Sequence, residues 1–165
     1  MTSPRDFEGV PRIGLGTDLH RLTPGRTCIL GGIVFDECPV GPDGHSDGDA
    51  VLHAVTDALL GAAGLDDLGT LFPDDQESNR DRPSADFVAE ACRRLQLARL
   101  APLSIDIAIQ CDRPKIAPRR AEIRAAIAKL VALPIDRVNV KGKTFEGVRA
   151  TDSEVVSVVA VVLVG

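Results

Sequence analysis

The chain has very few aromatic residues. Its 165 residues include no Trp and no Tyr, and aromatic side chains make up only 3% of the total. The core must therefore be built from Val, Leu, Ile and Ala, and aromatic platforms on which nucleic-acid bases could stack are scarce. With 44% hydrophobic residues the chain can bury one core, which predicts a single domain over residues 11–165 behind a loose polar arm at residues 1–10.

Excess positive charge and long apolar runs are also lacking. The formal net charge is -5, so no broad cationic surface attracts a phosphate polymer, although a local cluster of donors could hold one nucleotide. Residues 1–10 contain no continuous apolar stretch, and the most apolar run, Val155 to Val164, is about half the length of a membrane-spanning helix. We expect a small-molecule ligand, no nucleic-acid or membrane partner, and a cytoplasmic location.

Paired cysteine motifs are absent as well. None of the four cysteines belongs to a C-x-x-C pair, the pattern typical of zinc ribbons and redox motifs. Reduced structural thiols in a cytosol-like compartment are the expectation, rather than disulfides. These cysteines are Cys28, Cys38, Cys92 and Cys111.

Short segments with alternating or continuous apolar residues predict strands. Gly31 and Gly32 separate two of them and tolerate positive φ, which suits a hairpin turn. The segment Cys38–Gly44 is rich in Pro and Gly and predicts a loop, as does the polar segment Leu65–Pro83. The predicted strands are Arg12–Leu19, Thr27–Leu30, Ile33–Phe35, Leu103–Cys111, Arg137–Lys143 and Val155–Val164.

Three segments predict helices. The first should run from Ser46 to Ala63 and stop at Gly64. The Ser46 hydroxyl would cap its free N–H groups, and the Asp49 side chain, three residues on, would reach back to the cap residue. Its apolar residues recur at helical spacing and place one stripe on the core. The other two predicted helices are Ser84–Leu97 and Pro118–Leu133.

The order of these elements predicts an α+β fold. We expect a single-domain sandwich of a mixed four-stranded sheet with helices packed on one face, plus a small N-terminal hairpin. The last strand, Val155–Val164, is apolar at nearly every position. Both of its faces should therefore be covered, by helices or by another subunit.

Asp18 and His20 are two residues apart in a predicted strand, so their side chains point the same way and can converge on one ion. His53, carried by the first helix, would complete three protein ligands with one open position, the arrangement of catalytic zinc. Asp57, one turn beyond His53, could accept the other imidazole N–H, and Asp49 recurs on the same face. The alternative is an N-cap cluster beside a solvated polar face.

Longer motifs carry a resemblance to one family. RIGLGTDLH precedes HSDGD at His45–Asp49 and LHAVTDALLGAAGLDDLGTLFPD at Leu52–Asp74, and the similarity extends through Pro114-Lys115 to VNVKGKTFE at Val138–Glu146. This ordered set resembles the 2-C-methyl-D-erythritol 2,4-cyclodiphosphate synthase family of the non-mevalonate isoprenoid pathway. The resemblance implies a lyase that cyclises 4-diphosphocytidyl-2-C-methyl-D-erythritol 2-phosphate and releases CMP, in a homotrimer with active sites between subunits.

The resemblance also implies roles for individual residues. Asp18, His20 and His53 would hold zinc, and Glu146 a second divalent ion, magnesium or manganese, that bridges the substrate diphosphate. His45 and Ser46 would contact phosphates, helped by free N–H groups at the helix N-terminus. The methylerythritol end would meet Asp67, Leu68, Gly69 and Asp74. The cytidine pocket would comprise Cys111, Pro114, Lys115, Ile116, Ala117, Lys141, Gly142, Lys143 and Thr144.

Two features depart from that family. The segment GVRATDSE after Glu146 is shorter than the Gly/Phe/Arg segment of many members, and Thr17 replaces an aromatic residue of some relatives. The sequence therefore leaves open whether an isoprenoid diphosphate binds at the trimer axis, where Arg149 is the residue that could replace the family's basic one. No activated Ser or Cys dyad is found, and the substrate's own anionic 2-phosphate would serve as nucleophile. Two other interpretations remain open: a zinc phosphoesterase, and a non-catalytic module in which a metal holds the fold.

Overall fold

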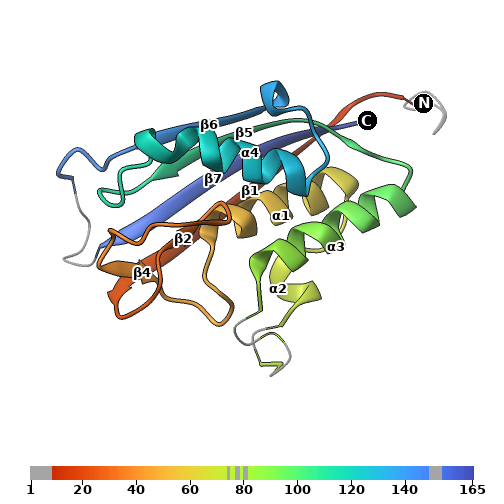
Figure 1. Ribbon diagram of the computed structural model, residues 1–165. Coiled ribbons are helices and arrows are strands. Elements are labelled where there is room, and N and C mark those ends of the chain that lie inside the picture. The colour runs from red at the N-terminus through yellow and green to blue at the C-terminus, as the bar shows by residue number, and fades with distance from the viewer. Residues whose placement is uncertain (1–8, 74, 77–78, 80–81, 149–153) are drawn as a thin grey trace.

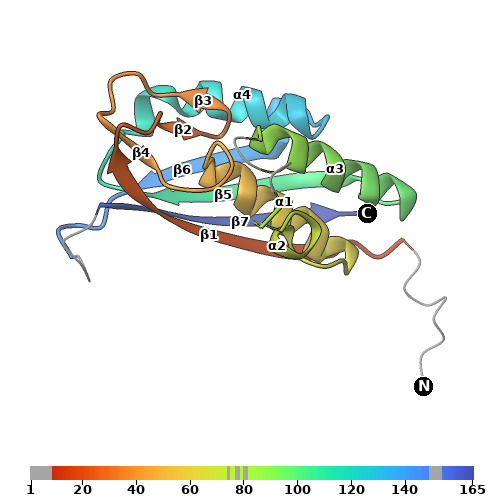
Figure 2. The same cartoon turned by 90° about the horizontal axis from the view of Figure 1, so that it is seen from below.

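A mixed sheet with helices on one face forms the body of the molecule, as the computed structural model shows for residues 9–73, 75–76, 79, 82–148 and 154–165 (Figures 1 and 2). The strands are β1 (Arg12–Pro24), β2 (Ile29–Leu30), β3 (Ile33–Val34), β4 (Val40–Pro42), β5 (Pro102–Gln110), β6 (Val138–Lys143) and β7 (Val155–Val164). The α-helices are α1 (Ala50–Ala63), α2 (Leu68–Leu71), α3 (Ser84–Leu97) and α4 (Arg120–Leu130). Two 3-10 turns, Ala117–Arg119 and Ile135–Arg137, flank α4. The α+β class is confirmed.

The main sheet has five strands in the order β4-β1-β7-β5-β6. Only β5 and β6 pair in parallel, so the prediction of a mixed sheet is confirmed. The predicted number of four strands is wrong because Val40–Pro42, expected in a loop, pairs with the end of β1. That pairing exists because β1 continues five residues beyond Leu19, to Pro24. The predicted hairpin forms a separate two-stranded sheet, β2 with β3.

Helix α1 lies directly against strand β1, and two glycines make this approach possible. A Cβ atom at Gly14 would lie 1.8 Å from the carbonyl oxygen of Ala58, and one at Gly16 would lie 2.0 Å from that of Ala54. Both alanines are fully buried. The side chains of the inner face of β1 are consequently brought beside those of α1.

The first helix begins later than predicted, at Ala50, and its cap is Asp49 rather than Ser46. The Asp49 carboxylate accepts the N–H groups of Val51 and Leu52, and also those of the hairpin glycines Gly31 and Gly32. One fully buried side chain thus caps α1 and fastens the β2–β3 turn to it. The predicted end at Gly64 is confirmed, with φ of +71°.

The remaining helices agree with the prediction to different degrees. Helix α3 has the predicted bounds, whereas the helix expected over Pro118–Leu133 is a 3-10 turn followed by the shorter α4. The predicted loop Leu65–Pro83 contains the single-turn helix α2. In the part of the chain described, no helix combines the length and hydropathy needed to cross a bilayer. The four cysteines carry free thiols.

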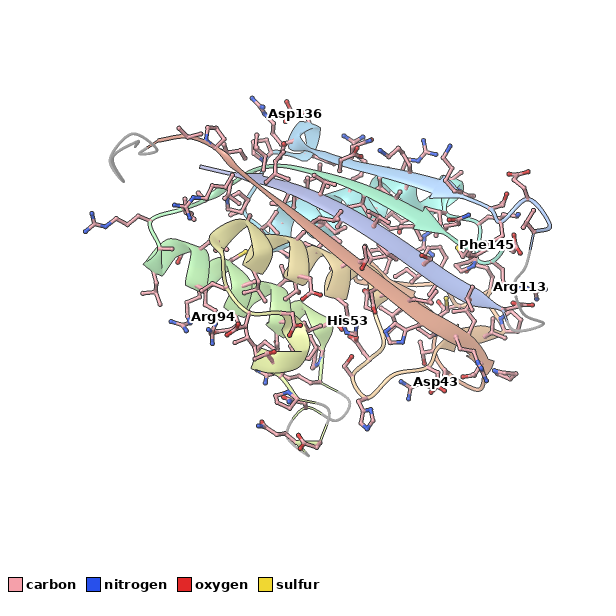
Figure 3. All side chains as sticks on the ribbon, turned by 180° about the vertical axis from the view of Figure 1, so that it is seen from behind. Asp43, His53, Arg94, Arg113, Asp136 and Phe145 are labelled. Atoms are coloured by element: carbon pink, nitrogen blue, oxygen red, sulfur yellow. The ribbon has the colours of Figure 1, made fainter. Side chains whose placement is uncertain are left out.

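The sheet face opposite the helices is uncovered within one chain (Figure 3), and over β1 and β7 it exposes apolar side chains. On β7 the inward side chains are buried, but Val159 and Val161 remain 41% and 38% exposed. On the adjoining strand β1, Ile13, Leu15 and Leu19 are 70%, 61% and 64% exposed. The helices thus cover only one face of β7, and coverage of the other face by a second subunit stays a prediction.

Candidate active site

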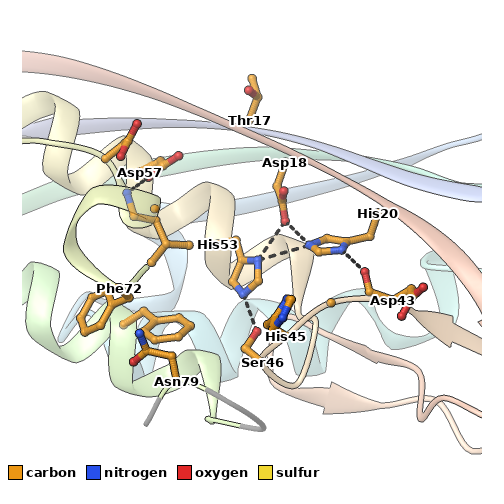
Figure 4. Close-up of a pocket in the computed structure, with 15 residues that line it drawn as sticks. Thr17, Asp18, His20, Asp43, His45, Ser46, His53, Asp57, Phe72 and Asn79 are labelled. Atoms are coloured by element: carbon orange, nitrogen blue, oxygen red, sulfur yellow. Dashed lines mark hydrogen bonds and ion pairs between the residues drawn. The ribbon is translucent and has the colours of Figure 1, made fainter. Parts of the chain in front are cut away.

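Three side chains from β1 and α1 converge at one point (Figure 4). Oδ2 of Asp18 lies 2.9 Å from Nε2 of His20 and 3.0 Å from Nδ1 of His53, and the two nitrogens are 3.4 Å apart. Asp18 and His20 reach the same side because they alternate with Leu19 along the strand. His53 reaches them because α1 lies so close to β1. The predicted convergence of these three residues is observed.

The outer nitrogen of each imidazole has a partner that directs the inner nitrogen toward this point. Nδ1 of His20 lies 2.6 Å from the carbonyl oxygen of Asp43, which can only accept, so Nδ1 carries the proton and Nε2 presents its lone pair. Nε2 of His53 lies 3.0 Å from Oγ of Ser46 and 2.9 Å from Oγ of Ser84. A proton on that Nε2 leaves Nδ1 free as a ligand atom.

This donor set fits a zinc ion. Zinc bonds of about 2.0–2.1 Å in tetrahedral geometry separate neighbouring ligand atoms by about 3.3 Å, and the three separations here are 2.9, 3.0 and 3.4 Å. The group opens into a cavity of about 430 Å³, which leaves a coordination position on the cavity side. Among the described residues it is the one group of three or more His, Cys, Asp or Glu that could hold a metal ion.

The ionised state of Asp18 favours cation binding, whereas at His20 a cation competes with a proton. Burial acts to raise the pKa of Asp18, but hydrogen bonds and charge interactions with His20 and His53 outweigh it and hold that pKa well below its usual range. Burial acts to lower the pKa of His20, and the contacts with Asp18 and the Asp43 carbonyl raise it above its usual value. Asp18 is therefore an ionised ligand near neutral pH.

Asp57 does not support His53 as predicted. Its Oδ1 accepts the backbone N–H of Leu68 at 2.7 Å, and burial raises its pKa. It lies one helical turn from His53 but turns toward α2, whose position the sequence did not indicate. The partner that sequence reasoning missed is Ser84, 31 residues beyond His53, which only the packing of α3 beside α1 brings into contact.

The anion site expected at the start of α1 is also different. The N–H groups of Val51 and Leu52 are taken by Asp49, and that of Gly48 donates to Oγ of Ser46 at 3.2 Å. Few free N–H groups therefore point from this helix end toward a phosphate. An anion at this position would therefore be bound by the side chains of His45 and Ser46, which both line the cavity.

The cavity beside the metal group contains most of the residues predicted for the methylerythritol end. Asp67, Leu68 and Gly69 line it, and Oδ1 of Asp67 caps α2 by accepting the N–H of Thr70 at 2.8 Å. Hydrogen bonds from the Thr70 side chain and from its backbone N–H lower the pKa of Asp67. Asp74 lies outside the described residues. Other lining residues, which the sequence did not single out for this cavity, are Thr17, Asp43, Gly44, Phe72, Asn79 and Phe87.

A second pocket, of about 330 Å³, lies between the ends of β5 and β6 and the start of α4. Gly142 lets the chain pass close to Ile116, since a Cβ there would lie 2.8 Å from Cβ of Ile116. Lys141 is not among the lining residues and instead bonds Oδ2 of Asp106 at 2.6 Å. The lining is otherwise the predicted cytidine set with Glu146: Cys111, Pro114, Lys115, Ile116, Ala117, Gly142, Lys143, Thr144 and Glu146.

Glu146 belongs to the second pocket alone. Its carboxylate accepts the hydroxyl of Thr144, and its φ of +52° turns the chain at the pocket rim. The two pockets have no lining residue in common. Within one chain, the residue predicted to hold the second ion therefore does not join the group Asp18, His20 and His53.

The fold and this site define an α+β protein with a candidate metal site of three side chains that opens into a cavity. The model of the YgbB family matches residues 11–165, and the chain belongs to this family.

Several relatives carry the same name. A protein of Rhodopirellula baltica named 2-C-methyl-D-erythritol 2,4-cyclodiphosphate synthase is 46% identical over 168 residues, covering 99% of this chain and 97% of its own. A solved structure of a synthase of that name in a CDP-bound form is 42% identical, with a TM-score of 0.86 over 93% of this chain and 100% of that one. The Plasmodium falciparum IspF–CDP complex is 30% identical, with a TM-score of 0.81 over 93% and 95% of the two chains.

Proposed function

We propose that this protein converts 4-diphosphocytidyl-2-C-methyl-D-erythritol 2-phosphate to 2-C-methyl-D-erythritol 2,4-cyclodiphosphate and releases CMP. The observation that carries the proposal is the group Asp18, His20 and His53, which opens into the same cavity as Ser46 and Asp67. The high identity to relatives named for this activity supports the substrate.

In the proposed reaction an oxygen of the substrate's 2-phosphate attacks the β-phosphorus, and the bond to CMP breaks. That oxygen is anionic near neutral pH, so the protein has to position two repelling phosphates rather than remove a proton. Ser46 and His45 are placed to hold phosphate oxygens, and Asp67 with Leu68 and Gly69 to bond the hydroxyls of the methylerythritol. Zinc at the Asp18 group, with magnesium or manganese at Glu146, would supply charge stabilisation when bound.

The second pocket is proposed to hold the cytidine. Lys115 and Lys143 bring positive charge to its lining, while Ile116 and Ala117 supply apolar surface for the base. CDP in the related solved structures agrees with a nucleotide of this class. Burial raises the pKa of the Cys111 thiol to about 12, so Cys111 contributes a neutral, apolar wall.

We further propose a homotrimer with shared active sites. Two observations support it: the two pockets have no residue in common, and the outer face of β1 and β7 exposes Ile13, Leu15 and Leu19. Association through this face would cover the apolar surface and could place the second pocket of one subunit beside the metal group of the next. A cytoplasmic location is also proposed, which suits the four free thiols.

One observation favours a second candidate, a hydrolase. Ser46, His53 and Asp18 lie in the order hydroxyl, imidazole, carboxylate, with separations of 3.0 Å at each step, as in a Ser-His-Asp triad. In that case Nδ1 of His53 would carry a proton for Asp18 and no metal would be needed. Mass spectrometry of the product separates the two: cyclisation gives a cyclic diphosphate and CMP, whereas hydrolysis gives a linear phosphate that incorporates ¹⁸O from labelled water.

A further inference from the structure

The Nε2 nitrogen of His53 has two hydroxyl neighbours but only one proton to donate. Oγ of Ser84 lies at 2.9 Å and Oγ of Ser46 at 3.0 Å. Both distances are suitable for a hydrogen bond, so distance does not decide which hydroxyl keeps the imidazole in place. The other bonds of each serine do decide it.

The Ser84 hydroxyl can only accept a hydrogen bond from His53. Ser84 is fully buried at the start of α3, its hydroxyl donates to Oδ1 of Asp47 at 2.5 Å, and its backbone N–H donates to Oδ2 of the same carboxylate at 3.0 Å. Because the hydroxyl proton is directed to Asp47, only the lone pairs of Oγ remain for His53. The bonds run in one direction, from Nε2–H of His53 to Ser84 and from Ser84 to Asp47.

Asp47 is itself fixed by the loop. Its Oδ1 accepts the N–H of Asp49 at 3.1 Å, and its own N–H donates to the carbonyl of Arg82 at 3.2 Å. The carboxylate therefore joins the loop before α1 to the start of α3. Phe87 of α3 packs against that ring, with centroids 5.8 Å apart.

In the part of the chain that the structure describes, the Ser46 hydroxyl is not held by a carboxylate in this way. Its Oγ accepts the N–H of Gly48 at 3.2 Å, and no carboxylate takes its proton among the described contacts. Unlike Ser84, it lines the cavity beside the metal group. Its hydroxyl can therefore turn away from His53 toward a ligand at little cost, provided that Ser84 still holds the imidazole.

We propose that Ser84, oriented by Asp47, is the positioning residue that sets the tautomer and ring orientation of His53 for metal binding, and that Ser46 is thereby left free to contact a substrate phosphate. The first half concerns the metal group alone, and the second half rests on the proposed function. The arrangement resembles the carboxylate–histidine–metal units in which an outer carboxylate orients a ligating imidazole, with a serine hydroxyl inserted between carboxylate and imidazole.

The test compares Ser84→Ala with Ser46→Ala, a matched pair that each remove one hydroxyl from the same nitrogen. Zinc affinity is measured without substrate, by competition with a chromophoric chelator. We expect Ser84→Ala and Asp47→Asn to weaken zinc binding by about 10- to 100-fold, the range for loss of an outer partner. Ser46→Ala should change zinc affinity less than about threefold and should instead raise KM for the diphosphocytidyl substrate.

A second measurement separates positioning from general damage to the fold. ¹⁵N NMR of the histidine rings in the zinc-loaded protein should show a single tautomer of His53, with Nδ1 on the metal and Nε2 protonated, in the wild type and in Ser46→Ala, and more than one state of the ring in Ser84→Ala. Ser84→Thr, which keeps the hydroxyl, should retain the single tautomer. Wild-type zinc affinity in Ser84→Ala, or an equal loss in Ser46→Ala, overturns the proposal. A protein that binds zinc through this chain of bonds but forms no cyclic product would leave the role of Ser84 intact and refute only the proposed function.

Discussion

Nδ1 of His53 lies 3.0 Å from Oδ2 of Asp18, a contact between residues 35 positions apart that joins helix α1 to strand β1. It depends on the close packing at Gly14 and Gly16, where a side chain would overlap the backbone of α1. The metal group is therefore assembled by the fit of a helix to a strand, and changes in that fit should alter metal binding.

Gly16→Ala tests this dependence. Its Cβ would lie 2.0 Å from the carbonyl oxygen of Ala54, so α1 must move outward. We expect a loss of about 1–3 kcal/mol in the free energy of unfolding, as for an overpacked core, and a clear fall in bound zinc. Urea denaturation and metal analysis measure the two effects.

Gly61→Ala is the matched control because its Cβ meets only the carbonyl oxygen of Leu15, at 3.9 Å. Replacing this helical glycine should leave zinc binding unchanged and raise stability by about 0.5–1 kcal/mol. Equal zinc content in Gly16→Ala and Gly61→Ala would show that the metal group does not depend on this contact.

Arg26 should hold in place the loop that carries His45 and Ser46. Its guanidinium donates to the carbonyl oxygens of Pro42, Gly44 and Ser46 at 3.3, 2.8 and 3.1 Å. Arg26→Lys keeps the charge but loses the planar fork, so we expect kcat/KM to fall by about tenfold or more while the fold persists.

Steady-state kinetics with the diphosphocytidyl substrate measure the effect, and Lys129→Ala on the exposed side of α4 is the control. The circular dichroism spectrum should be the same for all three proteins. An Arg26→Lys enzyme with wild-type kcat/KM would mean that the three carbonyl contacts are not needed to position the loop.

Asp49→Ala should be strongly destabilising. The carboxylate satisfies four backbone N–H groups, two at the start of α1 and two in the β2–β3 turn, and three of these hydrogen bonds are buried, the one from Gly32 being partly exposed. Loss of a helix cap costs about 1 kcal/mol, and each buried N–H left without a partner adds about 1–3 kcal/mol. We expect Asp49→Ala to lose more than about 2 kcal/mol in the free energy of unfolding, measured by chemical denaturation. The control Asp66→Ala, at an exposed position, should stay within about 0.5 kcal/mol of the wild type.

The buried thiols should make the stability of the fold depend on pH in the alkaline range. Burial, with the Cys38 side chain and the Asp112 carboxylate nearby, raises the pKa of Cys111 to about 12, and burial also raises the pKa of Cys28. The unfolded chain ionises its thiols near pH 9, before the folded chain does. The stabilising effect of these neutral thiols is therefore present below pH 9 and is lost as the pH rises toward 12.

Alkylation by iodoacetamide, followed by mass spectrometry, tests this prediction. In the folded protein Cys111 should react far more slowly at pH 8 than in the urea-denatured protein, because on the order of one thiol in ten thousand is ionised. Its rate should keep rising by about tenfold per pH unit beyond pH 9. A rate that levels off near pH 9 in the folded protein would contradict the raised pKa.

The elements that depend on local sequence were predictable. The bounds of α3, the end of α1 at Gly64 and the turn at Gly31-Gly32 follow from apolar spacing and from glycine's freedom at positive φ. Asp18 and His20 could be paired because strand alternation fixes the direction of their side chains. His53 could be added because the chain has only three histidines.

The features that depend on contacts between distant segments were not predictable. Strand β4 is too short and too rich in Pro and Gly to be recognised, and it exists only because β1 offers it an edge. Asp57 was expected to hold His53 because it lies one turn away, yet it bonds Leu68. The supporting residue, Ser84, comes from another helix, and no local pattern connects it to His53.

The central claim is that the Asp18, His20 and His53 group binds zinc and that cyclisation depends on it. The most direct measurement is parallel metal analysis and ³¹P NMR of the reaction products for the wild type and His53→Ala, with magnesium present throughout. We predict about one zinc per wild-type chain, with cyclic diphosphate and CMP formed in equal amounts, and neither zinc nor cyclic product in His53→Ala. A zinc-free His53→Ala protein that forms the cyclic diphosphate at the wild-type rate would contradict the claim.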